Sequence, residues 1–336
     1  MPRILATGAI LALTLVGPAA CDWVSLARQS VAYRTVAGAE AANVVAHDSG
    51  FAASRADSGV GIGERSTLRG AGRADDLAVD GRLLFVLDAL PPGRLSVVSL
   101  GGEGRGARVL DWREVAVGPF SGVAAANGVV VVSGGTSRLT AWRYDSAGLL
   151  AGPYATADLG RGQPDVLLSR DGTVAYVSTH YWGPRFGLDI VATAPDARGV
   201  LPLLGSLPLE GAGFTDGGAK PASFPIECAL LDDGTVLVAH RRGVAVVDVR
   251  DPRMPRLVDV VDVGGPAVNV DALGGTAAVS VAGRRPAIVL LDFTRGASPG
   301  RKGIALPPGT LPLGVALSRE QVAVAARGRG VLIFPR

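Results

Sequence analysis

Short continuous runs of apolar residues recur along the chain from about residue 74, and three kinds of run follow one another in a fixed order. The first kind opens each unit, at Asp76–Val79, Gly122–Ala125, Asp165–Leu168, Glu227–Leu230, Asn269–Ala272 and Gly314–Leu317. The second kind follows at Leu83–Leu87, Val129–Ser133, Val174–Ser178, Val236–His240, Ala277–Val281 and Val322–Ala326. The third kind follows at Leu95–Val98, Leu139–Trp142, Leu188–Val191, Val244–Val247, Ile288–Leu291 and Val331–Phe334. Most first and second runs are separated by Asp-Gly, Asn-Gly or Gly-Gly, which tolerate the positive φ that hairpin turns require.

This repeat is typical of a β-propeller. A weaker fourth run, such as Leu257–Val261, ends most units, so four short strands recur about every 40–50 residues, as in propeller blades. The second and third runs are continuously apolar, which predicts central strands buried on both faces between stacked blades. We therefore expect an all-β fold, a six-bladed β-propeller, with seven blades as the alternative.

The last unit predicts how the ring closes. It begins near Pro308 and stops at Arg336, just after its third strand. Because an unpaired strand edge promotes aggregation, another segment should supply the fourth strand. Glu64–Leu68 directly precedes the first strand of the first unit, where a fourth strand falls in every other unit. We expect this N-terminal strand to close a propeller domain over residues 61–336.

One stretch resembles a known repeat. Arg242–Pro252, reading Arg-Gly-Val-Ala-Val-Val-Asp-Val-Arg-Asp-Pro, continues through Met254–Val258. It is similar to the LVIVD repeat of secreted bacterial propeller-like proteins, and Ile288–Asp292 is a weaker echo. The Asp251-Pro252 pair would form the turn between third and fourth strands, because proline presets φ there. The resemblance implies a secreted propeller of a family whose function is largely unassigned.

The N-terminus predicts an export signal. Arg3 precedes an apolar segment, Ile4–Val16, that is too short to span a bilayer. Small residues then lead to Cys21, an arrangement that resembles the lipobox of bacterial lipoproteins, in which the cysteine is lipidated and becomes the new N-terminus. We expect a signal peptide over residues 1–20, then a lipidated Cys21 and a flexible tether over residues 21–60, rich in Ala, Ser, Gly and Asp. The alternative is an ordinary secreted protein cleaved nearby.

Composition excludes several classes of protein. The net charge is +3, and the basic residues are scattered rather than clustered, so we expect no nucleic-acid partner. The two cysteines exclude a disulfide-dense scaffold and a four-thiolate metal site. Cys228 lies in an apolar run, which predicts a buried, inert thiol.

The sequence holds no HExxH, CxxCH or P-loop motif and no complete GxGxxG. One GxSxG match, Gly296–Gly300, falls between a predicted third and fourth strand, and no helical pattern follows it. Because a nucleophile elbow needs a strand before the serine and a helix after it, we interpret this match as chance. No cofactor and no catalytic residue are assigned.

Polar residues open several of the first strands. Aligned strands place four of them at one equivalent position near the propeller axis: Asp76, Asp165, Glu227 and Asn269. Hard cations such as Ca²⁺ take oxygen ligands from such sets, and Zn²⁺ also binds carboxylates. The arrangement resembles that of six-bladed lactonases and related hydrolases, which hold a divalent ion on the axis. The other interpretation is that polar residues simply face a water-filled channel.

Loops at the same end of the ring supply a candidate binding face. It comprises His180, Tyr181, Trp182, Arg185, His240, Arg241 and Arg242, and the insertion at Glu210–Ser223 could cover it. Loops on a rigid scaffold commonly carry binding residues, and Trp, Tyr and Arg are enriched at interface hot spots. The other interpretation is that the aromatic side chains pack over the edge of a blade.

Two functional hypotheses follow. The first is a lipid-anchored cell-envelope propeller, facing the periplasm or exterior, that binds a protein, peptide or glycan without catalysis. The alternative is a lactonase-like, metal-dependent hydrolase with the acidic ring as ligands.

Overall fold

The computed structural model describes residues 34–36, 44–47, 50–55, 59–62, 66–68, 74–90, 92–101, 106–118, 121–134, 137–160, 162–180, 186–209, 227–295, 298–327 and 329–336. These residues form strands and turns, and none of them lies in a helix. Within this part of the chain, no helix is long and apolar enough to cross a membrane.

The strands form seven four-stranded antiparallel sheets, which we call blades and name by their strands. The first two blades are β2 (Val44–His47), β3 (Gly50–Arg55), β4 (Gly59–Ile62) and β5 (Ser66–Leu68), then β6 (Asp76–Asp80), β7 (Leu83–Asp88), β8 (Arg94–Ser99) and β9 (Arg108–Glu114). The next two are β10 (Val123–Ala126), β11 (Val129–Ser133), β12 (Arg138–Tyr144) and β13 (Leu150–Asp158), then β14 (Gly162–Leu168), β15 (Val174–His180), β16 (Phe186–Ala192) and β17 (Leu203–Pro208). The fifth and sixth are β18 (Cys228–Leu230), β19 (Thr235–His240), β20 (Gly243–Asp248) and β21 (Arg256–Val261), then β22 (Ala267–Leu273), β23 (Thr276–Val281), β24 (Ala287–Asp292) and β25 (Gly300–Ala305). The last is β26 (Leu311–Leu317), β27 (Gln321–Arg327), β28 (Gly330–Pro335) and β1 (Arg34–Val36).

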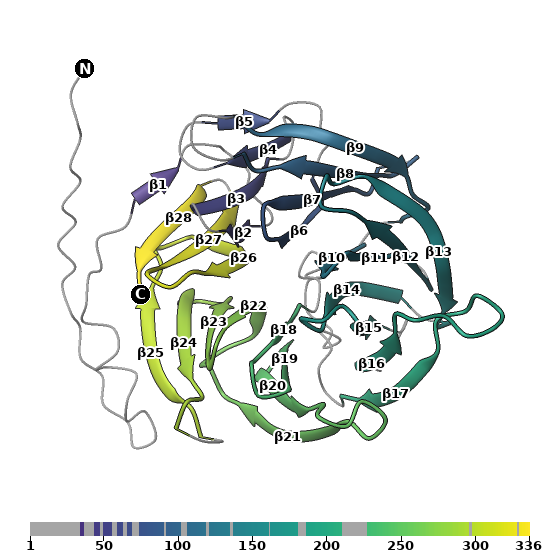
Figure 1. Cartoon of the computed structure of the whole chain (residues 1–336). Coiled ribbons are helices and arrows are strands. Elements are labelled where there is room, and N and C mark those ends of the chain that lie inside the picture. Colours follow the sequence, from purple (N-terminus) through teal and green to yellow (C-terminus); the bar gives the residue numbers. More distant parts are fainter. Residues whose placement is uncertain are drawn as a thin grey trace, which may run out of the picture.

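The blades form a closed ring around a central axis (Figure 1). The innermost strands β2, β6, β10, β14, β18, β22 and β26 contact one another in succession, and β26 contacts β2 again. The predicted all-β propeller is therefore confirmed. All six predicted blades are present, and the β2–β5 blade is a seventh sheet, which matches the count given as the alternative.

The β2–β5 blade lies in a segment that the sequence assigned mainly to the tether. Strands begin at Arg34, so the domain boundary expected at residue 60 is too late. Its strands are short and rich in alanine and glycine, as in Gly50–Arg55, and therefore lack the continuous apolar runs of the other blades. Phe51 and Val60 are nonetheless buried in cores shared with the neighbouring blades.

An N-terminal strand closes the ring, as expected, but it is a different segment. Strand β1 pairs antiparallel with β28, with Arg34 opposite Ile333 and Val36 opposite Val331. The predicted segment, Glu64–Leu68, instead contributes β5, the outer strand of its own blade. A segment just before β6 is correctly placed for a fourth strand, but this strand belongs to the β2–β5 blade and not to the last blade.

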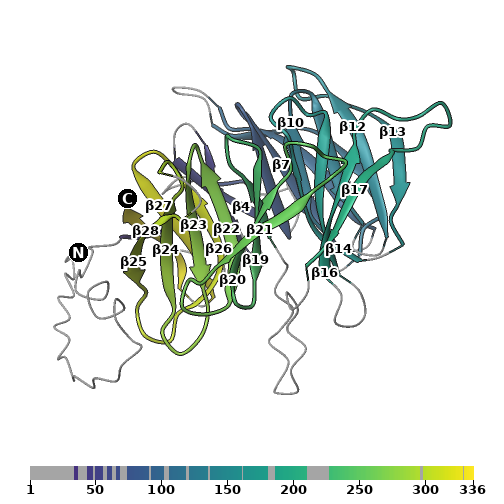
Figure 2. The same ribbon diagram turned by 90° about the horizontal axis from the view of Figure 1, so that it is seen from below.

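The core lies between blades, as the continuous apolar runs predict. Strands β11 and β20 are buried along their whole length. One core cluster contains Leu237 from β19, Val246 from β20 and Val279 from β23, so it spans two blades. Figure 2 views the same sheets from the side, with turns at both ends of the strands.

The antiparallel order gives the ring two faces. The loop face carries the connections from second to third strands and from one blade to the next. The turn face carries the connections from first to second and from third to fourth strands. Asn127 and Gly128, in one first-to-second turn, have φ of 48° and 79°, as a tight hairpin requires.

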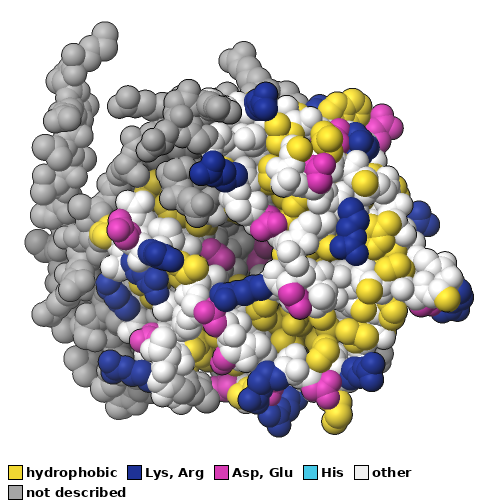
Figure 3. All heavy atoms as spheres, in the orientation of Figure 1, with side chains coloured by type: hydrophobic (Ala, Val, Ile, Leu, Met, Phe, Trp, Pro, Cys, Tyr) yellow, Lys and Arg dark blue, Asp and Glu magenta, His cyan; other side chains and the backbone are white. Residues whose placement is uncertain are grey.

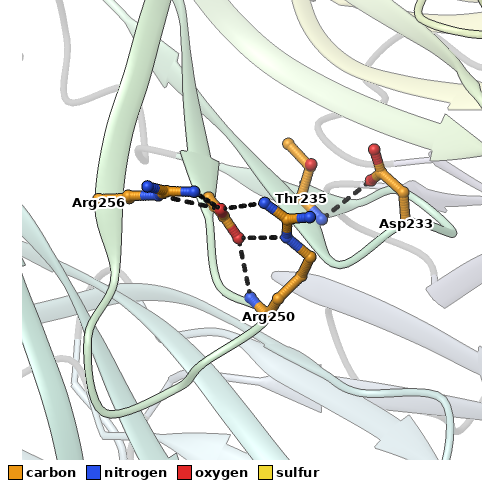
Figure 4. Close-up of polar contacts among 5 residues, drawn as sticks. Asp233, Thr235, Arg250 and Arg256 are labelled. Carbon is orange, nitrogen blue, oxygen red and sulfur yellow. Dashed lines mark hydrogen bonds and ion pairs between the residues drawn. The ribbon is translucent and has the colours of Figure 1, made fainter. Parts of the chain in front are cut away.

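The stretch that resembles the LVIVD repeat forms a bonded corner on the turn face (Figure 4). The Asp248 carboxylate accepts hydrogen bonds from the Arg250 guanidinium at 2.7 and 3.0 Å and from that of Arg256 at 2.8 and 3.1 Å. These bonds hold the pKa of Asp248 well below its usual range. Asp251 Oδ1 accepts the backbone N–H of Arg253 at 3.0 Å, so the Asp-Pro pair lies in the predicted turn.

Candidate functional site

Hydrogen bonds between blades engage the polar residues that open the inner strands. Asp76 Oδ2 accepts the backbone N–H of Val123 at 2.7 Å. Asp165 Oδ2 accepts that of Cys228 at 2.8 Å. In the third case, Asn269 Oδ1 accepts the N–H of Val315 at 3.1 Å. Each side chain thus reaches from one blade to the inner strand of the next.

The three bonds join equivalent positions of successive blades. Each donor follows the residue that the repeat aligns with the acceptor, namely Gly122, Glu227 and Gly314. At Gly122 a side chain would be crowded, because a Cβ there would lie 3.0 Å from the Cα of Asp165. The glycine at position 122 therefore reflects the close approach of two neighbouring inner strands at the axis.

In three blades, a serine near the end of the second strand contacts the residue at this position of the first strand. Ser133 Oγ accepts the N–H of Gly122 at 2.6 Å. Ser178 and Ser280 lie opposite Asp165 and Asn269, and their hydroxyls donate to the carbonyls of those residues at 3.4 and 3.5 Å. These contacts fix the backbone from which the inter-blade side chains project.

Burial and mutual repulsion set the charge of the axial carboxyls. Burial raises the pKa of Asp76 to about 8, and the nearby Asp165 carboxylate adds to the rise. The pKa of Asp165 is also raised by burial. Burial, together with repulsion from Asp165 and Asp76, holds the pKa of Glu227 well above its usual range. The three carboxyls therefore lie near enough to resist simultaneous ionisation.

Cys228 is a buried thiol, as predicted. Its Sγ donates to Asp165 Oδ2 at 3.2 Å. Burial and the neighbouring Asp165 raise the pKa of this thiol well above its usual range. A thiol that remains protonated can hold the carboxylate but is a poor nucleophile.

The proposed metal ligands come together only in part. Asp76, Asp165 and Glu227 influence one another electrostatically. Asn269 lies on β22, in the blade that follows the one that Glu227 precedes. Among the described residues, no group of three or more His, Cys, Asp or Glu side chains could hold a metal ion. Figure 3 shows acidic side chains beside the hollow at the centre of the ring.

The candidate binding face was predicted from two loops, and the structure describes the one between β19 and β20. His240 is buried, and its Nδ1 accepts the backbone N–H of Arg242 at 3.0 Å, which shapes the turn from β19 to β20. Arg241 is half-buried and Arg242 is exposed on the loop face. His180 is the last residue of β15. Tyr181, Trp182, Arg185, the insertion at Glu210–Ser223 and Cys21 lie outside the described residues.

The GxSxG match falls between β24 and β25, as expected, and Ser298 is exposed there.

Sequence reasoning missed four arginines on the loop face. Arg284 and Arg285 lie between β23 and β24, while Arg327 ends β27 and Arg329 follows it. They occupy the same connection as Arg241 and Arg242 in the two following blades. Aligning these connections, as the first strands were aligned, would have revealed them.

Comparisons with known proteins support the fold. No family model and no curated protein matches the chain. Similar solved structures include streptogramin B lyase, with 11% identity, a TM-score of 0.62, and coverage of 91% of this chain and 97% of that one. The WD40 propeller domain of Doa1 has 15% identity and a TM-score of 0.58, over 90% and 96%. The periplasmic gluconolactonase of Pseudomonas aeruginosa has 14% identity and a TM-score of 0.52, over 70% and 72%. At such identities the similarity shows that the chain shares a β-propeller fold.

The axial pKa shifts predict how stability depends on pH. The folded protein binds protons at Asp76 more tightly than the unfolded chain, whose carboxyl has a pKa near 3.8. This contribution to stability is fully present below the unfolded pKa and is lost as the pH rises through about 8. Because Asp165 and Glu227 shift in the same direction, the melting temperature should fall between about pH 5 and about pH 8.

Asp76→Asn should flatten this fall, since the amide keeps an acceptor for the Val123 N–H but cannot titrate. Asp292→Asn is the matched control, because the pKa of this exposed-turn carboxyl is lowered by its bonds to Thr294 and it stays ionised over the same pH window. Melting curves across the range measure both. Equal slopes for wild type and Asp76→Asn would contradict the axial assignment.

Proposed function

We propose that the protein is a non-catalytic binding module of the bacterial cell envelope. A lipid on Cys21 anchors it to a membrane, with the propeller facing the periplasm or the exterior. The loop face binds a partner, which is a protein, peptide or glycan. The tether between Cys21 and the first strand is shorter than the sequence suggested, because β1 begins at Arg34.

One observation carries the proposal. The side chains at the axis that are best suited to chemistry already bond neighbouring blades, as Asp76, Asp165 and Asn269 do. The buried thiol of Cys228 adds a further bond to Asp165. Groups engaged in this way hold the scaffold rigid, which leaves recognition to the exposed loops.

A metal-dependent hydrolase is the second candidate. The mutual repulsion of Asp76, Asp165 and Glu227 favours it, because a divalent cation among them would relieve that repulsion. The similar structures include a lyase and a gluconolactonase as well as a WD40 domain, so the shared fold does not discriminate between these classes.

The anchor is tested by fractionation. Wild-type protein should partition with membranes, because each buried methylene group of the acyl chains on Cys21 would add about 0.8 kcal/mol to the membrane affinity. Cys21→Ser should be released or remain as unprocessed precursor. A Cys21→Ser protein that is cleaved and still fractionates with membranes would disprove lipidation.

The binding face is tested by photocrosslinking in intact cells. Arg242→Cys on the loop face and Arg319→Cys on the turn face each add one exposed thiol, while Cys228 stays buried and protonated. A maleimide–benzophenone reagent attached at either position inserts into any C–H bond nearby. We expect higher-mass adducts from Arg242→Cys and few from Arg319→Cys. Equal adduct yields from both variants would contradict a binding role for the loop face.

A further inference from the structure

Arginine pairs recur at one connection of three consecutive blades. Arg241 and Arg242 join β19 to β20, and Arg284 and Arg285 lie between β23 and β24. In the blade that follows, Arg327 and Arg329 flank the turn from β27 to β28. Since all three connections run from second to third strands, the six arginines lie on the loop face, along one arc of the ring. We call them the arginine arc.

The arginine arc is exposed. Arg242, Arg284, Arg285, Arg327 and Arg329 are all exposed, and Arg241 is half-buried. Within the described part of the chain, no acidic side chain forms an ion pair with Arg242, Arg284, Arg285 or Arg327. Arg329 donates to the carbonyl of Pro308 at 2.9 Å, which is a neutral partner.

Arginines on the turn face are used differently. There, ion pairs join Arg250 and Arg256 to Asp248, Arg198 to Asp196, and Arg170 to Asp232. Figure 3 shows basic and acidic side chains interspersed over the visible face. Ion pairs in turns account for these four arginines, whereas Arg242, Arg284, Arg285 and Arg327 of the arc form none with a described residue.

Few acidic side chains offset the charge of the arc. On the described parts of the loop face in these three blades, the acidic residues are Asp262 and Glu227. Asp262 Oδ1 accepts the N–H of Gly264 at 2.7 Å. Glu227 is half-buried at the axis, where its pKa is raised well above the usual range. The arc is therefore strongly basic.

The arc also lacks apolar anchors. The exposed large hydrophobic side chains of the described residues are Leu90, Trp112, Leu149, Val200, Leu203, Met254, Leu257, Val258 and Leu273, and none lies on these three connections. Protein interfaces are organised around a buried apolar or aromatic centre, and nothing on the arc supplies one. The charge is instead repeated from blade to blade, at the ~10 Å scale of packed sheets.

We propose that the arginine arc binds an acidic polysaccharide, a linear glycan that bears carboxylates at regular intervals. This rests on the proposed binding role of the loop face and names the ligand class. The planar guanidinium matches a carboxylate bidentately, so Arg242, Arg284, Arg285 and Arg327 offer such groups from three successive blades. Short connections between paired strands hold the groups at fixed intervals, which reduces the entropy lost on binding.

The path of the chain favours a free glycan over a lipid surface. In the β1–β28 pair, Arg34 lies opposite Ile333, towards the turn face, while Val36 lies opposite Val331, next to the arc. The chain therefore enters the ring from the turn-face side. A lipid on Cys21 then draws the turn face, rather than the arc, towards the membrane.

Purified protein and immobilised polygalacturonate test the proposal, with fully methyl-esterified polygalacturonate as the uncharged form of the same chain. The triple variant Arg242→Gln, Arg284→Gln, Arg285→Gln removes half of the arc. Its matched control is Arg82→Gln, Arg295→Gln, Arg319→Gln, which loses the same charge from exposed positions on the turn face. Melting curves establish that both variants are folded.

We expect wild-type protein to bind polygalacturonate, with an affinity that falls as salt is added, and not its methyl ester. The arc variant should bind about tenfold more weakly or worse, and the control within about twofold of wild type. Absence of binding, equal losses in the two variants, or equal binding to the methyl ester would each overturn the proposal. Tighter binding to duplex DNA or to phosphatidylglycerol vesicles would also overturn it. If this proposal fails while Arg242→Cys still gives face-specific adducts, the binding module stands with another ligand.

Discussion

The structure depends on joining each blade to the next at the axis, where inner strands approach most closely. Asp76, Asp165 and Asn269 meet this need by accepting a backbone N–H from the following blade. A backbone N–H buried without an acceptor would reduce the free energy of unfolding by roughly 1–3 kcal/mol, and each of these hydrogen bonds avoids that loss. The inner strands of all blades run in the same direction, from the loop face to the turn face, and the same hydrogen bond can therefore recur at equivalent positions. Gly122 shows the complementary solution, in which the absence of a side chain lets Asp165 approach.

The same constraint explains the unusual charge state of the axis. The carboxyls of Asp76, Asp165 and Glu227 are brought together by ring geometry, and burial in the channel disfavours their ionised forms. The thiol of Cys228 lies within this group as a donor to Asp165. The two faces of the ring are then free to differ. Paired charges stabilise corners of the turn face, such as that around Asp248, while the loop face carries the arginine arc.

Much of the fold could be predicted because the physical signal is local. Strands such as β11 and β20 are buried on both faces and therefore read as unbroken apolar runs. The β2–β5 blade was not predicted from the sequence, because its strands are rich in alanine and glycine, which pack between blades but have low strand propensity. At the axis, alignment of the repeats identified the equivalent positions. It could not show that Asp165 bonds Cys228, because the donor lies 63 residues away and the side chain's direction depends on the ring. The arginine arc was predictable from the same alignment applied to loops.

The measurement that tests this account most directly is thermal unfolding of chelator-stripped protein with and without added calcium or zinc. If Asp76 and Asp165 serve to join blades, the Oδ2 atom of each is engaged by a backbone N–H, and neither ion should raise the melting temperature. A ligand that binds only the folded state must raise it, in proportion to its concentration relative to its dissociation constant. An unchanged melting temperature with both ions is therefore the predicted result. A rise that disappears in the double variant Asp165→Asn, Glu227→Gln would contradict the account and show that the axis is a metal site.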